Sequence, residues 1–381
     1  MIIAHLSDLH LGYRAYTRTT PEGVNQREAD VASAVARAFE AVAQARPDLV
    51  LIAGDLFHSV RPSNGAIAEA FRALSRLATR LAGCPIVVVA GERDTPRSSD
   101  TTSILDLFSE IPGVHVATDR VERFELSAIR AEVVAAPHAA LLDGPVPLPG
   151  PREPGRAAVL VAHAAVRGAL SGEQAPSAGV ATVDLEELLA AGWDYVALGH
   201  HPHFLEVAPG VAYSGSLERT SGDPWSDTGI TRGFILHDTV TGDTALRPVA
   251  GRSVVDLPRL SAEGLSAADL SAAIARMARA AGAELNGALV RLVITDLPRQ
   301  KVRELDQEPL RAIRTRALHF VVDARPPERT GASVRIRGVS LEQQVEEFLG
   351  GAWTLTMEGI DREHLVELAR GYLRRAEERT R

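Results

Sequence analysis

The stretch IIAHLSDLH, residues 2–10, carries the pattern that decides the fold. A short apolar run leads directly into two polar side chains, Asp8 and His10. The apolar run is typical of a buried β-strand. In open α/β sheets, functional side chains gather at the carboxyl ends of the strands. A strand followed at once by these two residues is therefore the arrangement expected at the edge of a functional site.

The rest of the first half of the chain alternates apolar runs with amphipathic segments. Strands are predicted at 48–53, 86–90, 158–162 and 194–198, and helices at 27–45, 64–81 and 185–190. In the first of these helices, Val31, Val35, Phe39 and Val42 fall on one face. Strands that alternate with helices indicate an α/β fold built in layers.

Four further strands end as the first one does. They run into Gly54-Asp55, into Gly91-Glu92-Arg93-Asp94, into His163, and into Gly199-His200-His201-Pro202-His203. Each ending alone has a plainer interpretation, because Gly-Asp is common in turns and a single histidine is more often a core residue. Five such endings in succession are hard to obtain by chance. A glycine before the polar residue lets the chain turn sharply and lets backbone approach the site.

The residue types at these endings predict the chemistry. Carboxylates mixed with imidazoles suit manganese, iron or zinc better than calcium or magnesium alone. Asp8 and Asp55 are placed to share two ions, with Asp55 as the bridge between them. The sequence therefore predicts a centre of two divalent metal ions.

The order of the endings resembles a known motif series. Asp-x-His, Gly-Asp, Gly-Asn-His-Asp, a lone His and Gly-His-x-His follow one another in the calcineurin-like metallophosphoesterases. Three neighbouring stretches look like the SbcD subgroup, the nuclease subunits of DNA double-strand-break repair complexes. They are DLFHSVRPS at 55–63, TPR at 95–97 and YSGSLER at 213–219. The resemblance covers about residues 1–240 and is weaker beyond them.

The resemblance implies an architecture and a division of the chain. The expected fold is a four-layer α-β-β-α sandwich with a smaller α+β capping domain and C-terminal helices. The nuclease domain is expected at 1–254, the capping domain at 255–330, and a helical partner-binding tail at 338–381. Within that tail, helices are predicted at 341–349 and 362–377.

The resemblance also implies the ligands and the reaction. One ion would be held by Asp8, His10 and Asp55, and the other by Asp55, Glu92, His163 and His200. Manganese is the preferred metal, with iron, magnesium or zinc as alternatives. Two such ions clamp a phosphate and make hydroxide available at neutral pH. The expected activity is hydrolysis of DNA phosphodiester bonds, as in an exonuclease.

Two departures from the family lie in the third motif. Glu92 stands where the family has asparagine; it can still ligate through oxygen, but it adds a negative charge. Arg93 stands where the family has histidine, and a guanidinium keeps its proton, so it cannot act as a general acid. It can still stabilise charge on the phosphorane. Arg93 and Asp94 are the catalytic candidates, and the lost acid is expected to cost about 10²–10⁴-fold in rate.

The third departure is at the last motif, where the second histidine of Gly-His-x-His aligns with Pro202. Proline cannot bind a metal. His201 or His203 would fill the vacancy if the loop shifts by one residue. Both are therefore included among the candidate metal ligands.

Charge and composition bear on the partners. The net charge is −8, whereas a protein that grips a long stretch of nucleic acid alone is usually basic. Contact with DNA ends or hairpins is therefore expected to be local, or shared with a partner. The resemblance implies an SbcC-like coiled-coil ATPase and a homodimer. A single cysteine and the absence of any apolar stretch near the ~20 residues of a membrane span fit a cytoplasmic protein.

Two alternative functions stay open. The altered residues at 92, 93 and 202 fit a subunit that binds DNA or the ATPase but has lost its chemistry. The same metals would also serve a phosphatase or phosphodiesterase for small molecules or proteins, although the SbcD-like stretches argue against it.

Overall fold

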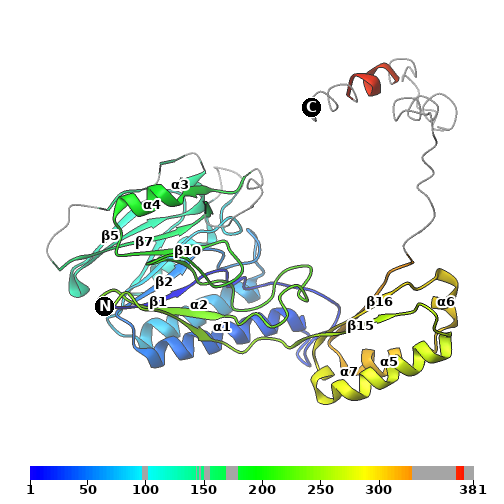
Figure 1. Cartoon of the computed structure of the whole chain (residues 1–381). Helices are drawn as coiled ribbons and strands as arrows, with labels where there is room; N and C mark the ends of the chain where they lie inside the picture. The colour runs from blue at the N-terminus through cyan, green and yellow to red at the C-terminus, as the bar shows by residue number, and fades with distance from the viewer. Residues whose placement is uncertain are drawn as a thin grey trace.

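The computed structural model describes residues 1–96, 102–142, 144–145, 147–149, 155–168, 179–327 and 366–372. Its larger lobe is built on two six-stranded sheets (Figure 1). The first sheet has the order β14 (Thr244–Pro248), β13 (Gly233–Asp238), β1 (Ile2–Leu6), β2 (Leu49–Ala53), β3 (Ile86–Val89) and β4 (Val114–Ala117). The second has the order β11 (Leu205–Ala208), β12 (Val211–Tyr213), β10 (Tyr195–Gly199), β7 (Ala157–His163), β6 (Ala131–Ala136) and β5 (Glu122–Leu126).

Strand direction brings the polar strand endings to one edge. In the first sheet β1 to β4 are parallel, and in the second β12, β10, β7 and β6 are parallel. Leu6 pairs with Ile52, and Gly199 pairs with His163. The residues that follow these strands therefore leave each sheet side by side, at the carboxyl edge where sites form.

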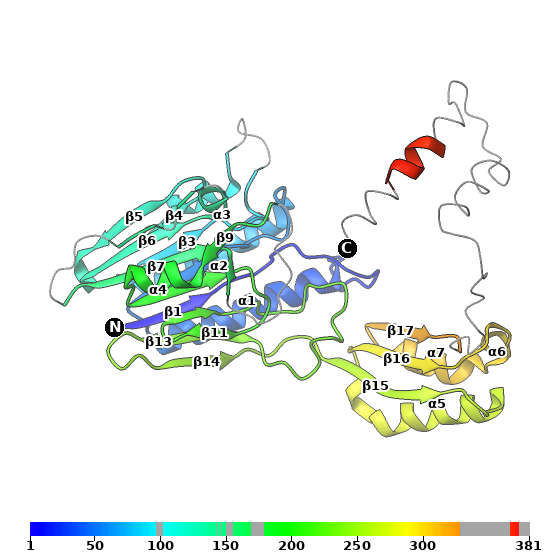
Figure 2. The ribbon, with the colours of Figure 1, turned by 45° about the horizontal axis from the view of Figure 1, so that its top comes forward.

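The two sheets pack face to face. Their shared interior is formed by small and branched apolar side chains, among them Ile3, Leu51, Val87, Val159 and Ala197. The outer face of the first sheet is covered by α1 (Gln26–Ala45), α2 (Asn64–Arg80) and η1 (Ile104–Glu110). The outer face of the second is covered by α3 (His138–Leu141), α4 (Leu185–Ala191) and the pair β8 (Ala165–Arg167) and β9 (Thr182–Asp184); η2 (Ser127–Ile129) follows β5. This arrangement confirms the predicted α-β-β-α layers (Figure 2).

The first helix illustrates how sequence sets these boundaries. The side chain of Asn25 accepts hydrogen bonds from the backbone N–H groups of Arg27 and Glu28, which caps α1. The apolar face predicted for this helix is buried against the first sheet. The helix ends where Arg46 adopts the left-handed conformation, with φ of 49°.

The smaller lobe has its own parallel sheet and its own core (Figure 1). The sheet has the order β15 (Val254–Ser261), β16 (Leu289–Thr295) and β17 (His319–Ala324). Its helices are α5 (Ala267–Ala281), η3 (Gly282–Leu285), α6 (Arg299–Glu304) and α7 (Gln307–Arg316). A capping box formed by Ser266 and Asp269 begins α5. Because β15 begins at Val254, it spans the predicted domain boundary, and the division of the chain stays a prediction.

The two lobes meet through aromatic and charged side chains. The ring of Tyr16 stacks on that of His319 at 3.8 Å between centroids. The indole N–H of Trp225 donates to the carbonyl of Leu289 at 3.3 Å. The predicted tail helices lie outside the described residues apart from 366–372, which are helical. In the described part of the chain, every helix is too short or too polar to cross a membrane.

Candidate metal centre

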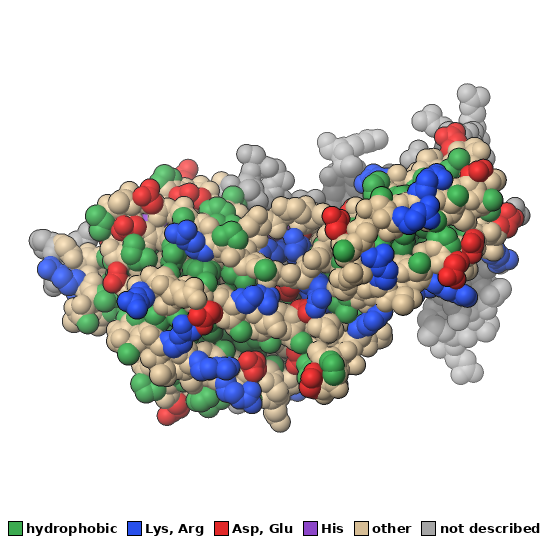
Figure 3. Space-filling model, turned by 90° about the horizontal axis from the view of Figure 1, so that it is seen from below, with side chains coloured by type: hydrophobic (Ala, Val, Ile, Leu, Met, Phe, Trp, Pro, Cys, Tyr) green, Lys and Arg blue, Asp and Glu red, His purple; other side chains and the backbone are tan. Residues whose placement is uncertain are grey.

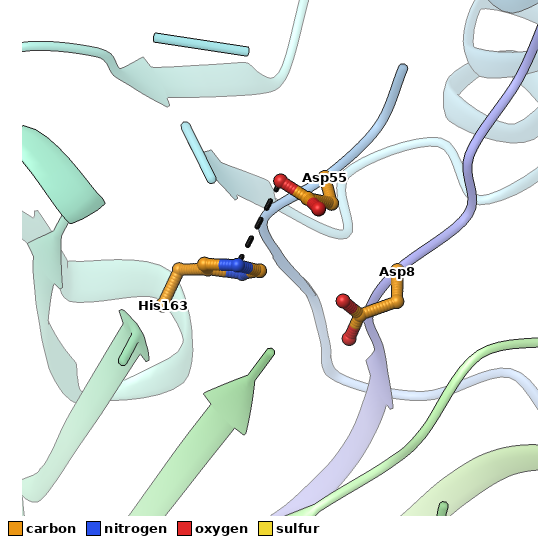
Figure 4. Close-up of side chains that lie close together, drawn as sticks. All are labelled: Asp8, Asp55 and His163. Carbon is orange, nitrogen blue, oxygen red and sulfur yellow. Dashed lines mark ion pairs between the residues drawn. The ribbon is translucent and has the colours of Figure 1, made fainter. Parts of the chain in front are cut away.

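Three of the predicted ligands converge at the carboxyl edge of the sheets. Asp8 follows β1, Asp55 follows β2, and His163 ends β7. Their ligand atoms all lie within 4.8 Å of one another. Figure 4 shows how the three side chains converge. The side chains are buried, with exposed fractions of 4% for Asp8, 2% for Asp55 and 0% for His163. Two carboxylates and an imidazole removed from water in this way form a ligand set of the kind that divalent transition metals prefer.

A hydrogen bond to the backbone fixes the orientation of the His163 ring. Its Nδ1 lies 2.9 Å from the carbonyl of Ala53 and donates to it, which links the second sheet to the first. The other ring nitrogen, Nε2, lies 3.7 Å from Oδ1 of Asp55 (Figure 4). Among the described residues this buried Nε2 has no hydrogen-bond partner. In metal-binding histidines, one ring nitrogen typically donates to a carbonyl or carboxylate and the other faces the metal. His163 has this arrangement, with Nδ1 on the carbonyl of Ala53 and Nε2 facing Asp55.

His10 presents a second free nitrogen to the same carboxylate. Its Nδ1 lies 3.9 Å from Oδ2 of Asp55 and, within the described residues, also has no hydrogen-bond partner. Burial lowers the pKa of His10 well below its ordinary value, and the charges of neighbouring His58 and Arg93 lower it further. The ring is therefore neutral at neutral pH, as a metal-binding imidazole must be.

Gathering these carboxylates in a buried site has an electrostatic cost. Burial raises the pKa of Asp55 to about 8, and the charges of Asp94 and Asp8 add to the rise. Burial by itself lowers the pKa of His163, but the carboxylates of Asp55 and Asp8 outweigh it and the net shift is upward. A divalent ion that binds here would therefore displace protons from these groups.

The backbone at four of the predicted ligands adopts positive φ angles. Asp8, His10 and Asp55 have φ of 51°, 50° and 51°, and His200 has φ of 104°. Non-glycine residues in this region cost about 1–3 kcal/mol each and persist where the surrounding structure enforces them. The turn that follows each strand thus directs its side chain into the site.

Glycine is required beside two of these turns. A Cβ atom at Gly91 would lie 2.1 Å from Oδ1 of Asp55. A Cβ atom at Gly199 would lie 1.7 Å from the carbonyl of Ala53 and 2.7 Å from Nδ1 of His163. The prediction that glycine lets backbone approach the site is confirmed at both positions.

Glu92, Arg93 and His200 lie at the mouth of the site. The backbone N–H of Arg93 donates to Oδ1 of Asp55 at 2.9 Å, and its Nε lies 3.5 Å from Oδ2 of Asp55. Oε2 of Glu92 lies 4.0 Å from Nδ1 of His200. The backbone N–H of His200 donates to Oδ2 of Asp8 at 3.1 Å. The predicted ligands Glu92 and His200 are thus adjacent to the cluster, and Arg93 faces its central carboxylate.

His201 and His203 have other partners. Nε2 of His203 lies 2.9 Å from Oδ1 of Asp227, which also pairs with Arg232. Nδ1 of His201 lies 2.9 Å from the carbonyl of His203. The carbonyl of Pro202 accepts hydrogen bonds from Arg232 and from the backbone of Ser216, which holds the loop in place. The structure therefore does not bring His201 or His203 into the cluster, and their predicted role as replacement ligands stays a prediction.

Asp94 is buried behind the cluster and serves a different purpose from Arg93. Its carboxylate accepts hydrogen bonds from the backbone N–H groups of Leu56, Phe57 and Gly91, at 2.9–3.0 Å. These contacts tie the loop after β3 to the loop after β2. They are the contacts of a positioning residue, and the predicted catalytic role of Asp94 has no support in them.

A cavity of about 780 Å³ opens beside the cluster. Glu92 and Arg93 form one part of its lining, and His58 and Arg61 form another. The ring of His58 packs edge-on against that of His10, at 5.3 Å between centroids. No role was predicted for His58; its place three residues after Asp55 was the signal that could have indicated one.

Comparison with known proteins finds relatives among DNA double-strand break repair proteins. Proteins named "DNA double-strand break repair protein Mre11" match over part of their length. The protein of Methanococcus maripaludis is 31% identical over 118 residues, which cover 31% of this chain and 30% of that protein. Those of Thermoplasma acidophilum and Archaeoglobus fulgidus are 27% and 28% identical over 227 and 238 residues, covering 56% and 58% of this chain and 55% and 50% of theirs.

The chain thus spans about half or less of the length of these relatives. The sequence model of the family described as "Calcineurin-like phosphoesterase" matches residues 1–204, more than half of the 381 residues. The matched region contains the whole cluster and all the strands that carry it. The chain belongs to the calcineurin-like phosphoesterase family.

Proposed function

We propose that this protein is a metal-dependent nuclease that hydrolyses phosphodiester bonds of DNA, as a subunit of an SbcCD-like repair complex. The observation that carries the proposal is the buried convergence of Asp8, Asp55 and His163 within 4.8 Å. The repair function printed in the names of the Mre11 relatives supports DNA as the substrate.

The proposed centre holds two divalent ions. Asp8, His10 and Asp55 would bind one, and Asp55, Glu92, His163 and His200 would bind the other. Manganese is the proposed metal, because the set mixes carboxylates with imidazoles. When bound, such ions polarise a phosphodiester and activate water at neutral pH. The free ring nitrogens of His10 and His163 support this assignment.

The residues of the chain itself would divide the remaining tasks. Arg93, at the mouth of the site, is placed to stabilise negative charge on the phosphorane but cannot donate a proton to the leaving group. Asp94 would keep the loops that carry Asp55 and Arg93 in register, through its three backbone hydrogen bonds. The cavity beside Arg93 would receive the DNA strand next to the cleaved bond.

The proposed partners follow from the relatives and from the charge. On the face seen in Figure 3, arginine and lysine side chains are interspersed with acidic ones across both lobes. Together with the net charge of −8, this favours a DNA contact shared with an SbcC-like ATPase and with a second copy of the chain. The tail at 338–381 is the proposed ATPase contact. The single cysteine supports the proposed cytoplasmic location.

A second candidate is a binding subunit that has lost its chemistry. Two observations favour it. Arg93, which cannot act as a general acid, faces Asp55 at the position where the family has a histidine. His203 is held by Asp227 and does not face the cluster. Such a protein would keep the fold and the DNA or ATPase contact without cleavage.

A nuclease assay with manganese separates the candidates. The full chain is incubated with DNA ends and hairpins, with and without Mn²⁺, beside Asp55→Asn as the inactive control. The proposal predicts Mn²⁺-dependent cleavage that Asp55→Asn reduces by about 10³-fold or more, because Asp55 would help to hold both proposed ions. DNA binding without cleavage would favour the second candidate, and turnover of a chromogenic phosphodiester without DNA cleavage would indicate a small-molecule substrate.

A further inference from the structure

The two oxygens of the Asp55 carboxylate face different partners. Oδ1 lies 3.7 Å from Nε2 of His163 and accepts the backbone N–H of Arg93 at 2.9 Å. Oδ2 lies 3.9 Å from Nδ1 of His10 and 3.5 Å from Nε of Arg93. The guanidinium of Arg93 therefore lies near Oδ2, the oxygen that faces His10. His163 faces the other oxygen, Oδ1. We call these the His10 side and the His163 side of Asp55.

A guanidinium keeps its charge at any ordinary pH. On the His10 side it already supplies a positive charge to Oδ2, and a divalent ion bound there would be repelled by it. His203, a candidate replacement ligand, adds no donor to the cluster because its ring is paired with Asp227 at 2.9 Å. On the other side, Nε2 of His163 lies 3.7 Å from Oδ1 of Asp55, and Glu92 and His200 lie next to it.

We propose that Arg93 makes the two ion sites unequal. The ion on the His163 side binds first and tightly, and the ion on the His10 side binds weakly, because Arg93 competes with it for Asp55. Arg93 has room to withdraw, since its side chain is 42% exposed and lines the cavity of about 780 Å³. This inference rests on the proposed metal-dependent function and concerns the order and strength of ion binding.

The test is a titration of the full chain with Mn²⁺, followed by the electron paramagnetic resonance signal of the free ion and by calorimetry. We expect two binding steps in the wild type, the second at least about tenfold weaker than the first. Arg93→Gln should tighten the second step by about tenfold, because it removes the charge while the backbone hydrogen bond to Asp55 stays. Arg93→Lys retains the charge and should keep the two steps unequal.

Two further variants assign the steps. Arg61→Gln removes a cation from the same cavity, without contact to Asp55, and should leave both steps unchanged. His10→Ala should abolish only the weaker step, and His163→Ala should weaken the tighter one.

Failure of this inference can be told apart from failure of the proposed metal-dependent function. Two equal steps in the wild type, or an unchanged gap in Arg93→Gln, would overturn the inference and leave the proposed nuclease standing. No bound Mn²⁺ in any variant would overturn the proposed metal-dependent function itself.

Discussion

The loops that follow β1 and β2 and the loop that follows β10 meet at the same edge but deliver their side chains differently. Asp8 and Asp55 occupy left-handed backbone positions, and their carboxylates converge on His163. In the β10 loop, the side chain of His203 instead pairs with Asp227, 24 residues further along the chain.

The difference lies in what competes for each side chain. Around Asp55, burial outweighs the nearby ring of His163 and the backbone N–H of Arg93, and the pKa of Asp55 rises to about 8. Around His203, a carboxylate already paired with Arg232 offers a hydrogen bond at 2.9 Å. A residue of a metal-binding type can thus be held by a nearer protein partner instead, as His203 is by Asp227.

The largest expected effect comes from restoring an acid at the mouth of the site. At saturating Mn²⁺, Arg93→His should raise the rate of DNA cleavage by about 10²-fold or more, since a general acid contributes about 10²–10⁴-fold. Single-turnover rates on one labelled duplex measure it. Arg93→Gln is the matched control, because it removes the guanidinium without adding an acid. Equal rates for Arg93→His and the wild type would mean that the missing acid does not limit cleavage.

Stability should respond strongly where the two sheets meet. Gly199→Ala should lower the free energy of unfolding by roughly 3 kcal/mol or more, because its Cβ would collide with the carbonyl of Ala53. A Cβ atom at Gly222 would meet no other atom within 4 Å, so Gly222→Ala should change stability by less than about 0.5 kcal/mol. Urea denaturation of both variants checks this, and similar losses in the two would contradict the close approach.

Ion affinity should depend on pH in one direction. With the pKa of Asp55 raised to about 8 by burial, the ion-free site holds a proton at neutral pH that a divalent ion must displace. The apparent Kd for Mn²⁺ should therefore rise about tenfold between pH 7 and pH 6. Calorimetry in buffers of different ionisation heat would also register the released proton. A Kd that is constant over this interval would mean that the site is already deprotonated.

The smallest effect is expected in the β10 loop. His203→Ala should change Mn²⁺ affinity by less than about threefold, because its ring is held by Asp227 rather than by the cluster. A loss of tenfold or more would show that His203 leaves Asp227 when metal binds. In that case the predicted replacement of the missing histidine would be supported.

Much of the fold could be predicted from local pattern. The helix expected at 27–45 appears as Gln26–Ala45, and the strand expected at 48–53 appears as Leu49–Ala53. Apolar periodicity and strand–helix alternation are enough for this, because they fix which face is buried. The same alternation predicted that polar residues after parallel strands would share one edge.

The parts that escaped prediction depend on distant partners. The sequence pattern does not predict that Asp94 accepts hydrogen bonds from three backbone N–H groups, two of them in the loop after β2. It also does not predict that Asp227 pairs with His203, or that the guanidinium of Arg93 lies beside Asp55. These outcomes are set by tertiary packing, which places groups from separate loops within hydrogen-bond reach. The predicted tail contact lies outside the described residues.

Anomalous diffraction at the manganese edge from crystals soaked with Mn²⁺ addresses the metal centre directly. We predict a strong peak bounded by Asp8, Asp55 and His163, with a weaker peak or none beside His10 while Arg93 stays against Asp55. Saturated crystals that show no peak between those three side chains would contradict the metal centre, and with it the proposed hydrolysis of DNA.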